Sequence, residues 1–291
     1  MKNKTIFVIA LIQVLIIGLL MNIIYQKKYA KKTVLTPEYQ YAVIASPSGF
    51  LKYFYEPRPG VQELNLSWLG KQYDYRIKHS INADTFNQLT DIPVAKPKNT
   101  KRIITIGASF TFGGNVNTKD SYPSKLQEII DSSCKGNTRY QVINLGVFGY
   151  DIQYSVERYR KRGVKYDPDI VIWYLTADNF EKIQEWKAER IVKDMPWSEK
   201  SKIQAWHLRD LNEYVKKDLV FVSMPTLSWT YSQLLVTVKN NRQKTYVYRD
   251  SPDVVALHDV FPDQHPNEKG YKLIAEDIFR YLKKSNLIKC N

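Results

Sequence analysis

Cysteine and histidine are scarce in this 291-residue sequence. Its two cysteines, Cys134 and Cys290, form no CxxC pair, which argues against zinc ribbons and thioredoxin-like redox motifs. There are only four histidines and no spacing typical of metal ligands, so we expect neither a metal centre nor a cofactor. Helix-turn-helix and RNA-binding signatures are also missing, and nucleic acid is not an expected partner.

Acidic residues are outnumbered. The sequence has 29 Asp and Glu against 43 Lys and Arg, a formal net charge of +14. The basic residues are spread along the chain, a pattern that suits anionic lipid or an acidic envelope polymer. A hydrophobic content of 44% with 25% charged residues excludes a disordered chain.

Only one apolar run is long enough to cross a membrane. Residues 5–24 read TIFVIALIQVLIIGLLMNII and carry no charge. As a helix this segment would rise about 30 Å, the thickness of a bilayer core. No small-x-small cleavage site follows it, so we predict an uncleaved anchor with basic flanks over residues 1–32 rather than a removed signal peptide. Lysines are more numerous after the run than before it, which by itself would favour a cytoplasmic domain.

The rest of the chain divides near residue 100. Residues 33–100 predict a lead-in region of short strands, and 101–291 predict the main domain. Apolar runs of strand length lie at 102–107, 139–145, 169–175, 219–225 and 253–257. Helical patterns cover roughly 120–133, 151–163, 181–217 and 267–284. This alternation favours an α/β fold with a parallel sheet covered by helices on both faces.

Reactive side chains follow these strands, at the sheet edge where α/β proteins place their sites. Ser109 follows the first strand, Gly149 the second and the pair Asp178-Asn179 the third. Asp263 and His265 follow the last. A serine needs a base to accept its proton, the base needs a carboxylate, and the oxyanion needs fixed donors. The set therefore indicates acyl transfer.

Four sequence blocks carry a resemblance to the SGNH/GDSL hydrolase family, in its membrane-anchored bacterial form. They are IGASFTFGGNV, VINLGVFGYD, PDIVIWYLTADNF and DVFPDQHPNEKGYKLIAE, in that order. Thr111 stands where the G-x-S-x-G elbow of α/β-hydrolases has its second glycine, so that other motif does not fit. The resemblance implies a three-layer α/β/α, flavodoxin-like fold with a mainly parallel five-stranded sheet.

The resemblance also implies roles for single residues. Ser109 would be the nucleophile, His265 the general base and Asp263 its orienting acid, with Asp259 as the fallback acid. The backbone N–H groups of Ser109 and Gly149 would bind the oxyanion.

The third oxyanion donor is less direct, because the family reads Asn-Asp where this chain reads Asp178-Asn179. We expect Asn179 to donate, since a carboxylate at Asp178 would repel the developing charge. Ala108 also replaces an aspartate of the family motif.

Structural alternatives remain open for these residues. Ser109 could cap a helix, His265-Pro266-Asn267 could cap the last one, and Asn179 could cap a loop. Gly146 is expected to be structural.

The cysteines offer a further hypothesis. Cys134 lies 25 residues after Ser109, and Cys290 lies 25 residues after His265. Since both intervening helices should run back to the lower sheet edge, we hypothesise a Cys134–Cys290 disulfide, with two free thiols as the alternative. A disulfide indicates an oxidising compartment, and we therefore expect the domain outside the cytoplasm, against the lysine count.

The sequence thus predicts an anchored serine hydrolase that cleaves ester bonds of O-acylated envelope glycans or lipids. An O-acyltransferase using the same residues and a catalytically silent envelope-binding module remain the alternatives. The oligomeric state cannot be deduced.

Overall fold

The computed structural model describes most of the chain from residue 43 onward. The described residues are 43–46, 48–51, 54–68, 71–176, 218–223, 244–247, 261, 263 and 265–290, with Gln13, Ile17, Gly18 and Met21 before them. Residues 1–40 and 41–291 form separate compact units. No helix among the described residues is both long and apolar enough to span a membrane, and residues 5–24 lie almost wholly outside them.

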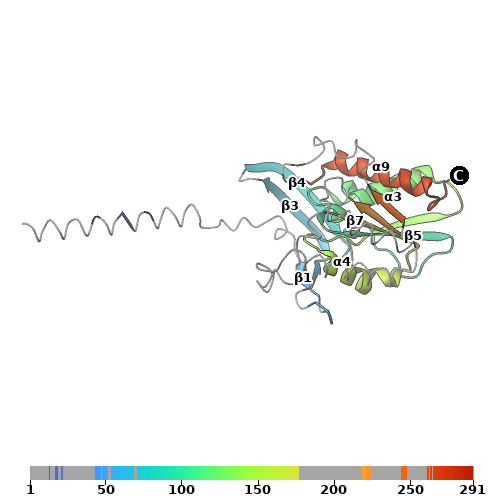
Figure 1. The fold of residues 1–291 in the computed structure, drawn as a ribbon, viewed down its shortest axis with the longest axis horizontal. Coiled ribbons are helices and arrows are strands. Elements are labelled where there is room, and N and C mark those ends of the chain that lie inside the picture. Colours follow the sequence, from blue (N-terminus) through green and yellow to red (C-terminus); the bar gives the residue numbers. More distant parts are fainter. Residues whose placement is uncertain are drawn as a thin grey trace, which may run out of the picture. The chain divides into compact units, whose positions relative to one another are not determined.

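Unit 41–291 is built on a parallel sheet of five strands in the order β6-β5-β7-β8-β9 (Figure 1). The strands are β5 (Thr100–Gly107), β6 (Arg139–Asn144), β7 (Ile170–Leu175), β8 (Asp218–Ser223) and β9 (Lys244–Val247). Every neighbouring pair is parallel. In order along the chain this is 2-1-3-4-5, the flavodoxin-like arrangement.

Helices cover both faces of this sheet. On one side α3 (Tyr122–Ser133) and α9 (Glu268–Lys284) pack against each other and against the strands; α4 (Ile152–Arg158) lies on the other side (Figure 1). The α3–α9 side shares one core cluster with Ile103, Ile172 and Tyr174. The alternate residues of β7, among them Val171 and Trp173, are also buried. Because both faces are covered, the strand reads IVIWYL without a polar residue.

The fifth strand of the sheet lies where the sequence analysis predicted no strand. It comes from Lys244–Val247, which reads KTYV, whereas the predicted run 253–257 lies outside the described residues. Among the described strands, β9 stands at the sheet edge and pairs with β8. An edge strand needs no continuous apolar run, so periodicity does not mark it. The predicted helix at 181–217 also lies outside the described residues.

The lead-in residues form two antiparallel hairpins. β1 (Val43–Ala45) pairs with β2 (Tyr55–Pro57), and β3 (Gly60–Trp68) pairs with β4 (Lys71–Ile81). Buried ion pairs from Glu56 on β2 to Arg158 and Arg162 tie the first hairpin to the α4 region. Burial alone would raise the pKa of Glu56, but hydrogen bonds and charges from the two arginines, with Ser46, lower it to about 2. The lead-in segment is thereby fixed to the main domain.

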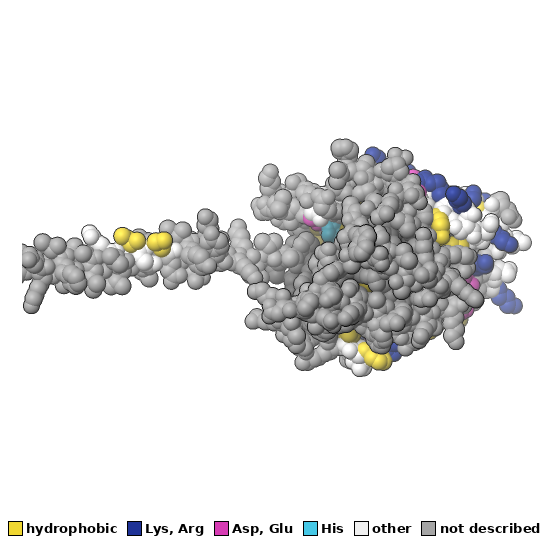
Figure 2. Space-filling view, in the orientation of Figure 1, with side chains coloured by type: hydrophobic (Ala, Val, Ile, Leu, Met, Phe, Trp, Pro, Cys, Tyr) yellow, Lys and Arg dark blue, Asp and Glu magenta, His cyan; other side chains and the backbone are white. Residues whose placement is uncertain are grey.

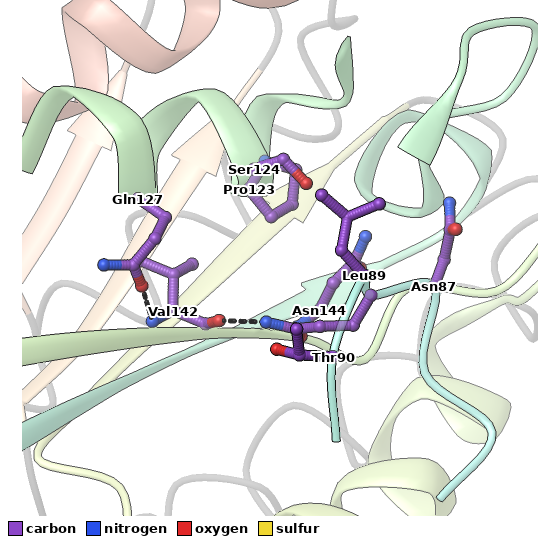
Figure 3. A pocket seen from close by; sticks show the side chains of 9 residues that line it. Asn87, Leu89, Thr90, Pro123, Ser124, Gln127, Val142 and Asn144 are labelled. Carbon is purple, nitrogen blue, oxygen red and sulfur yellow. Dashed lines mark hydrogen bonds between the residues drawn. The ribbon is translucent and has the colours of Figure 1, made fainter. Parts of the chain in front are cut away.

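The outer edge of β6 is closed by two glutamine side chains. Gln127 on α3 accepts from Val142 N at 2.6 Å (Figure 3). It also donates to Tyr140 O at 2.9 Å. Gln88 donates to Val142 O at 2.8 Å and accepts from Asn144 N at 3.2 Å. These amides replace a neighbouring strand and cap an edge that could otherwise pair with another chain. They also line a pocket of about 210 Å³.

A disulfide joins Cys134, just after α3, to Cys290, after α9, with a Cα–Cα distance of 4.0 Å. It fastens the two helices of one layer at their carboxyl ends. Lys and Arg side chains gather over α9 and near the C-terminus (Figure 2). Lys283 and Lys284 stand in the last turn of α9, where cations oppose the helix dipole favourably.

Candidate active site

The turn after β5 presents Ser109. Gly107 ends the strand with φ +150°, and a Cβ there would lie 2.4 Å from Thr111 Oγ1 and 2.7 Å from Tyr174 O. Only glycine fits so close an approach. Ala108 then occupies the cap position, and Ser109 opens the short helix α2 (Ser109–Phe112). Ser109 is therefore not the cap residue, and its hydroxyl is directed elsewhere.

That hydroxyl meets His265. The Nε2 atom of His265 lies 2.8 Å from Ser109 Oγ, within the distance needed for proton transfer. To accept the serine proton, Nε2 must be unprotonated, so the ring hydrogen belongs on Nδ1. The arrangement is a serine paired with a base.

Asp263 lies behind the imidazole. Its Oδ2 atom is 3.1 Å from His265 Nδ1, and its Oδ1 accepts from His265 N at 3.2 Å. The Nδ1 contact has ion-pair distance but not the alignment of a hydrogen bond. Both side chains are largely shielded, at 19% and 18% exposed. A carboxylate so placed favours the Nδ1–H tautomer and stabilises the imidazolium that proton transfer creates.

The residues around His265 anchor this loop. Phe261 N donates to His265 O at 2.7 Å. Asn267 caps α9 by accepting from Gly270 N at 3.0 Å. The cap residue of α9 is therefore Asn267 and not His265, whose side chain faces Ser109. The aromatic rings of Phe110 and Phe148 flank the imidazole, with centroids 5.3 and 6.0 Å away.

Asn115 is a site residue that sequence reasoning missed. Its Nδ2 donates to Asp263 Oδ2 at 2.6 Å, and the side chain is fully buried. It belongs to the same GASFTFGGN stretch as Ser109 but comes after a glycine pair that looks like an ordinary turn. An asparagine after two glycines is a common turn signal, so nothing local marked it as functional.

The expected oxyanion donors are described only in part. Gly149 has φ +72° and follows Phe148, whose ring lies beside His265. Gly146 packs on α2, where a Cβ would lie 2.3 Å from Phe112 N, so its role is structural. Asp178, Asn179 and Asp259 lie outside the described residues.

Comparison with known proteins gives structural neighbours only. No protein-family model and no curated protein matches the chain. The chain is similar to the psychrotrophic esterase EstA from Pseudoalteromonas sp., with 14% identity, a TM-score of 0.49, and 65% of this chain and 100% of that chain covered. It is similar to a GDSL-like lipase from Bacteroides thetaiotaomicron VPI-5482, with 12% identity, a TM-score of 0.44, and 67% and 93% covered.

A two-domain esterase active on acetylated mannans is also similar, with 17% identity and a TM-score of 0.49. That alignment covers 66% of this chain and 51% of the esterase. Identities and scores are low in all three cases. The roles of Ser109, Asp263 and His265 therefore rest on their own geometry.

Proposed function

We propose that this protein is a serine hydrolase of the SGNH type that cleaves ester bonds. The observation that carries the proposal is the 2.8 Å contact between Ser109 Oγ and His265 Nε2, with Asp263 Oδ2 3.1 Å from Nδ1. The three side chains lie in contact in the order nucleophile, base and acid, which is the order that acyl transfer requires.

The reaction proceeds in two halves. Ser109 Oγ attacks the ester carbonyl carbon while its proton passes to His265 Nε2. The tetrahedral intermediate collapses, the bond to the alkoxy oxygen breaks, and Nε2 returns the proton to the departing alcohol. Water then attacks acyl-Ser109, gives its proton to Nε2, and releases the carboxylic acid as Ser109 recovers its hydrogen. The N–H groups of Ser109 and Gly149, with the Asn179 amide, are the proposed oxyanion donors.

The substrate we propose is an O-acylated envelope glycan or lipid. The apolar run at 5–24 would hold the enzyme at a membrane, and the net charge of +14 suits an acidic envelope. The Cys134–Cys290 disulfide supports a domain outside the cytoplasm, where such bonds persist. Retention of the full chain in carbonate-washed membranes, and its release when residues 1–32 are deleted, would test the anchor.

An O-acyltransferase is the second candidate, because a sugar hydroxyl could replace water at acyl-Ser109 with no change of residues. Product analysis with an added sugar acceptor separates the two. Transfer of the acyl group to the acceptor in preference to water would replace the hydrolase by the transferase.

The primary test is turnover of p-nitrophenyl acetate by the detergent-solubilised full chain. Ser109→Ala should lower kcat by at least about 1000-fold. Ser132→Ala is the matched control, since that exposed serine of α3 donates only to Ile129 O, and it should keep the rate. Equal rates for wild type and Ser109→Ala would end the nucleophile role of Ser109, and rates no higher than uncatalysed hydrolysis would leave the protein as a silent binding module.

A further inference from the structure

One oxygen of Asp263 has two neighbours. Asp263 Oδ2 accepts from Asn115 Nδ2 at 2.6 Å and lies 3.1 Å from His265 Nδ1. The amide therefore restrains the same oxygen that faces the imidazole. The carboxylate cannot turn this oxygen away from the ring without losing the hydrogen bond from Asn115.

The backbone explains why an asparagine stands here. Asn115 has φ +67°, in the left-handed region that glycine, asparagine and aspartate tolerate best. Glycine would fit the backbone but has no amide. Aspartate would fit it too but would set a second carboxylate against Asp263, and the two like charges would repel each other. Asparagine alone satisfies both the backbone and the donor requirement.

The orientation of the amide is also determined. Reversing it would place Oδ1 against the carboxylate of Asp263, two acceptors facing each other. In the orientation observed, Oδ1 is buried, and no donor in the part of the chain that the structure describes bonds to it. A buried orphan acceptor is unfavourable for stability, and its presence here is accounted for by the Nδ2 contact.

Strand β4 holds the residues that follow Asn115. His79 Nε2 contacts Val116 O at 2.8 Å. Lys78 N donates to Asn117 Oδ1 at 3.0 Å, and Ser80 N donates to Thr118 Oγ1 at 2.7 Å. Three consecutive residues of β4 thus fasten residues 116–118. The amide of Asn115 is presented from a fixed backbone, as a positioning role requires.

We propose that Asn115 is a positioning residue that holds Asp263 against His265 during proton transfer. The proposal rests on the proposed function and deepens it, because it extends the Ser109–His265–Asp263 chain by a fourth member. It acts through Asp263 and does not touch the substrate.

The test uses three variants of the full chain. Asn115→Gly keeps the backbone conformation and removes the donor. Asn115→Asp keeps the shape and replaces the donor by a carboxylate. Asn286→Gly is the matched control, since Asn286 also has a left-handed backbone, with φ +56°, but stands in the exposed turn after α9. For each variant, kcat and KM for p-nitrophenyl acetate, the pH profile of kcat/KM and the melting temperature are measured.

Asn115→Gly should lower kcat about 10- to 100-fold with KM within about twofold, because a misplaced base slows the chemical step and leaves binding intact. Asn115→Asp should move the acid limb of the kcat/KM profile up by about one pH unit or more. Asn286→Gly should change neither. A purely structural role would instead lower the melting temperature and leave kcat and the profile of the folded protein unchanged.

A second readout needs no turnover. The low-field proton resonance of His265 Nδ1–H, the group that faces Asp263 Oδ2, is assigned by its loss in His265→Gln. It should disappear in Asn115→Gly and persist in Asn286→Gly. If Ser109-dependent turnover survives Asn115→Gly within about twofold and the resonance persists, the positioning role is overturned and the proposed function stands. If the wild type shows no Ser109-dependent turnover, the proposed function fails, and the resonance still decides whether Asn115 holds Asp263.

Discussion

The Nε2 atom of His265 lies 2.8 Å from the Oγ atom of Ser109, although 156 residues separate them in the chain. Cys134 and Cys290, joined by a disulfide, are separated by the same 156 residues. Helix α3 lies between Ser109 and Cys134 in the chain, and α9 lies between His265 and Cys290. The layer formed by these two helices therefore has the Ser109–His265 contact at one end and the disulfide at the other.

Asp263→Asn tests the acid of the site. The amide keeps the shape but loses the charge that stabilises the imidazolium and selects the Nδ1–H tautomer. We expect kcat for p-nitrophenyl acetate to fall about 10³- to 10⁴-fold with little change in KM. Asp131→Asn, at an exposed position on α3, is the control and should keep wild-type kinetics. An active Asp263→Asn variant would transfer the acid role to another residue, Asp259 first.

The central strands could be predicted from the sequence because burial on both faces requires a continuous run of apolar residues. The strands β5, β6, β7 and β8 each match a predicted apolar run to within two residues. β9 could not be predicted in this way, because a strand at the sheet edge can alternate polar with apolar residues. The first lead-in hairpin is tied to the main domain by Glu56 and Arg158, which are 102 residues apart. A single charged residue does not reveal so distant a partner.

The site was predictable where chemistry limits the choice of residue. A serine, an aspartate and a histidine after strand ends form a restricted set, and the topology brings strand ends together. Asn115 could not be found in this way. Its contact with Asp263 spans 148 residues, and a turn explains an asparagine after two glycines equally well.

Gly146→Ala tests how closely the loop after β6 packs against α2, the helix that begins at Ser109. The new Cβ would lie 2.3 Å from Phe112 N and 2.5 Å from Thr111 C, both backbone atoms of α2. Because α2 begins at Ser109, the helix must shift and carry Ser109 with it. We expect a loss of about 1–3 kcal/mol in the free energy of unfolding and at least a tenfold fall in kcat.

Gly49→Ala is the control for this substitution, since nothing lies within 4 Å of a Cβ at Gly49. Denaturant unfolding and ester kinetics of both variants make the comparison. Wild-type stability and kcat in Gly146→Ala would show that α2 can move without disturbing the Ser109–His265 contact.

Removal of the disulfide by Cys134→Ser should lower the free energy of unfolding by about 3–5 kcal/mol, because the bond closes a long loop of the unfolded chain. For a domain of this size that corresponds to a melting temperature lower by about 10 °C. The bond lies beyond the carboxyl ends of α3 and α9, so kcat at 25 °C should stay near the wild-type value. Dithiothreitol should lower the melting temperature of the wild type and leave that of Cys134→Ser unchanged; identical responses would show that the bond does not form.

His79 should make the protein sensitive to mild acid. The side chain is fully buried, and desolvation lowers its pKa from 6.5 to about 4, an effect that hydrogen bonds to the backbone only partly offset. Below about pH 6.5 the unfolded chain therefore binds a proton at this residue that the folded protein does not bind. The contribution of His79 to the free energy of unfolding is present in full above that pH and is lost as the pH falls towards 4. Between pH 7 and pH 5 the wild type should lose about 2 kcal/mol of unfolding free energy from this residue. Urea unfolding of His79→Gln should show a pH dependence weaker by that amount, and parallel curves for the two proteins would contradict the buried neutral imidazole.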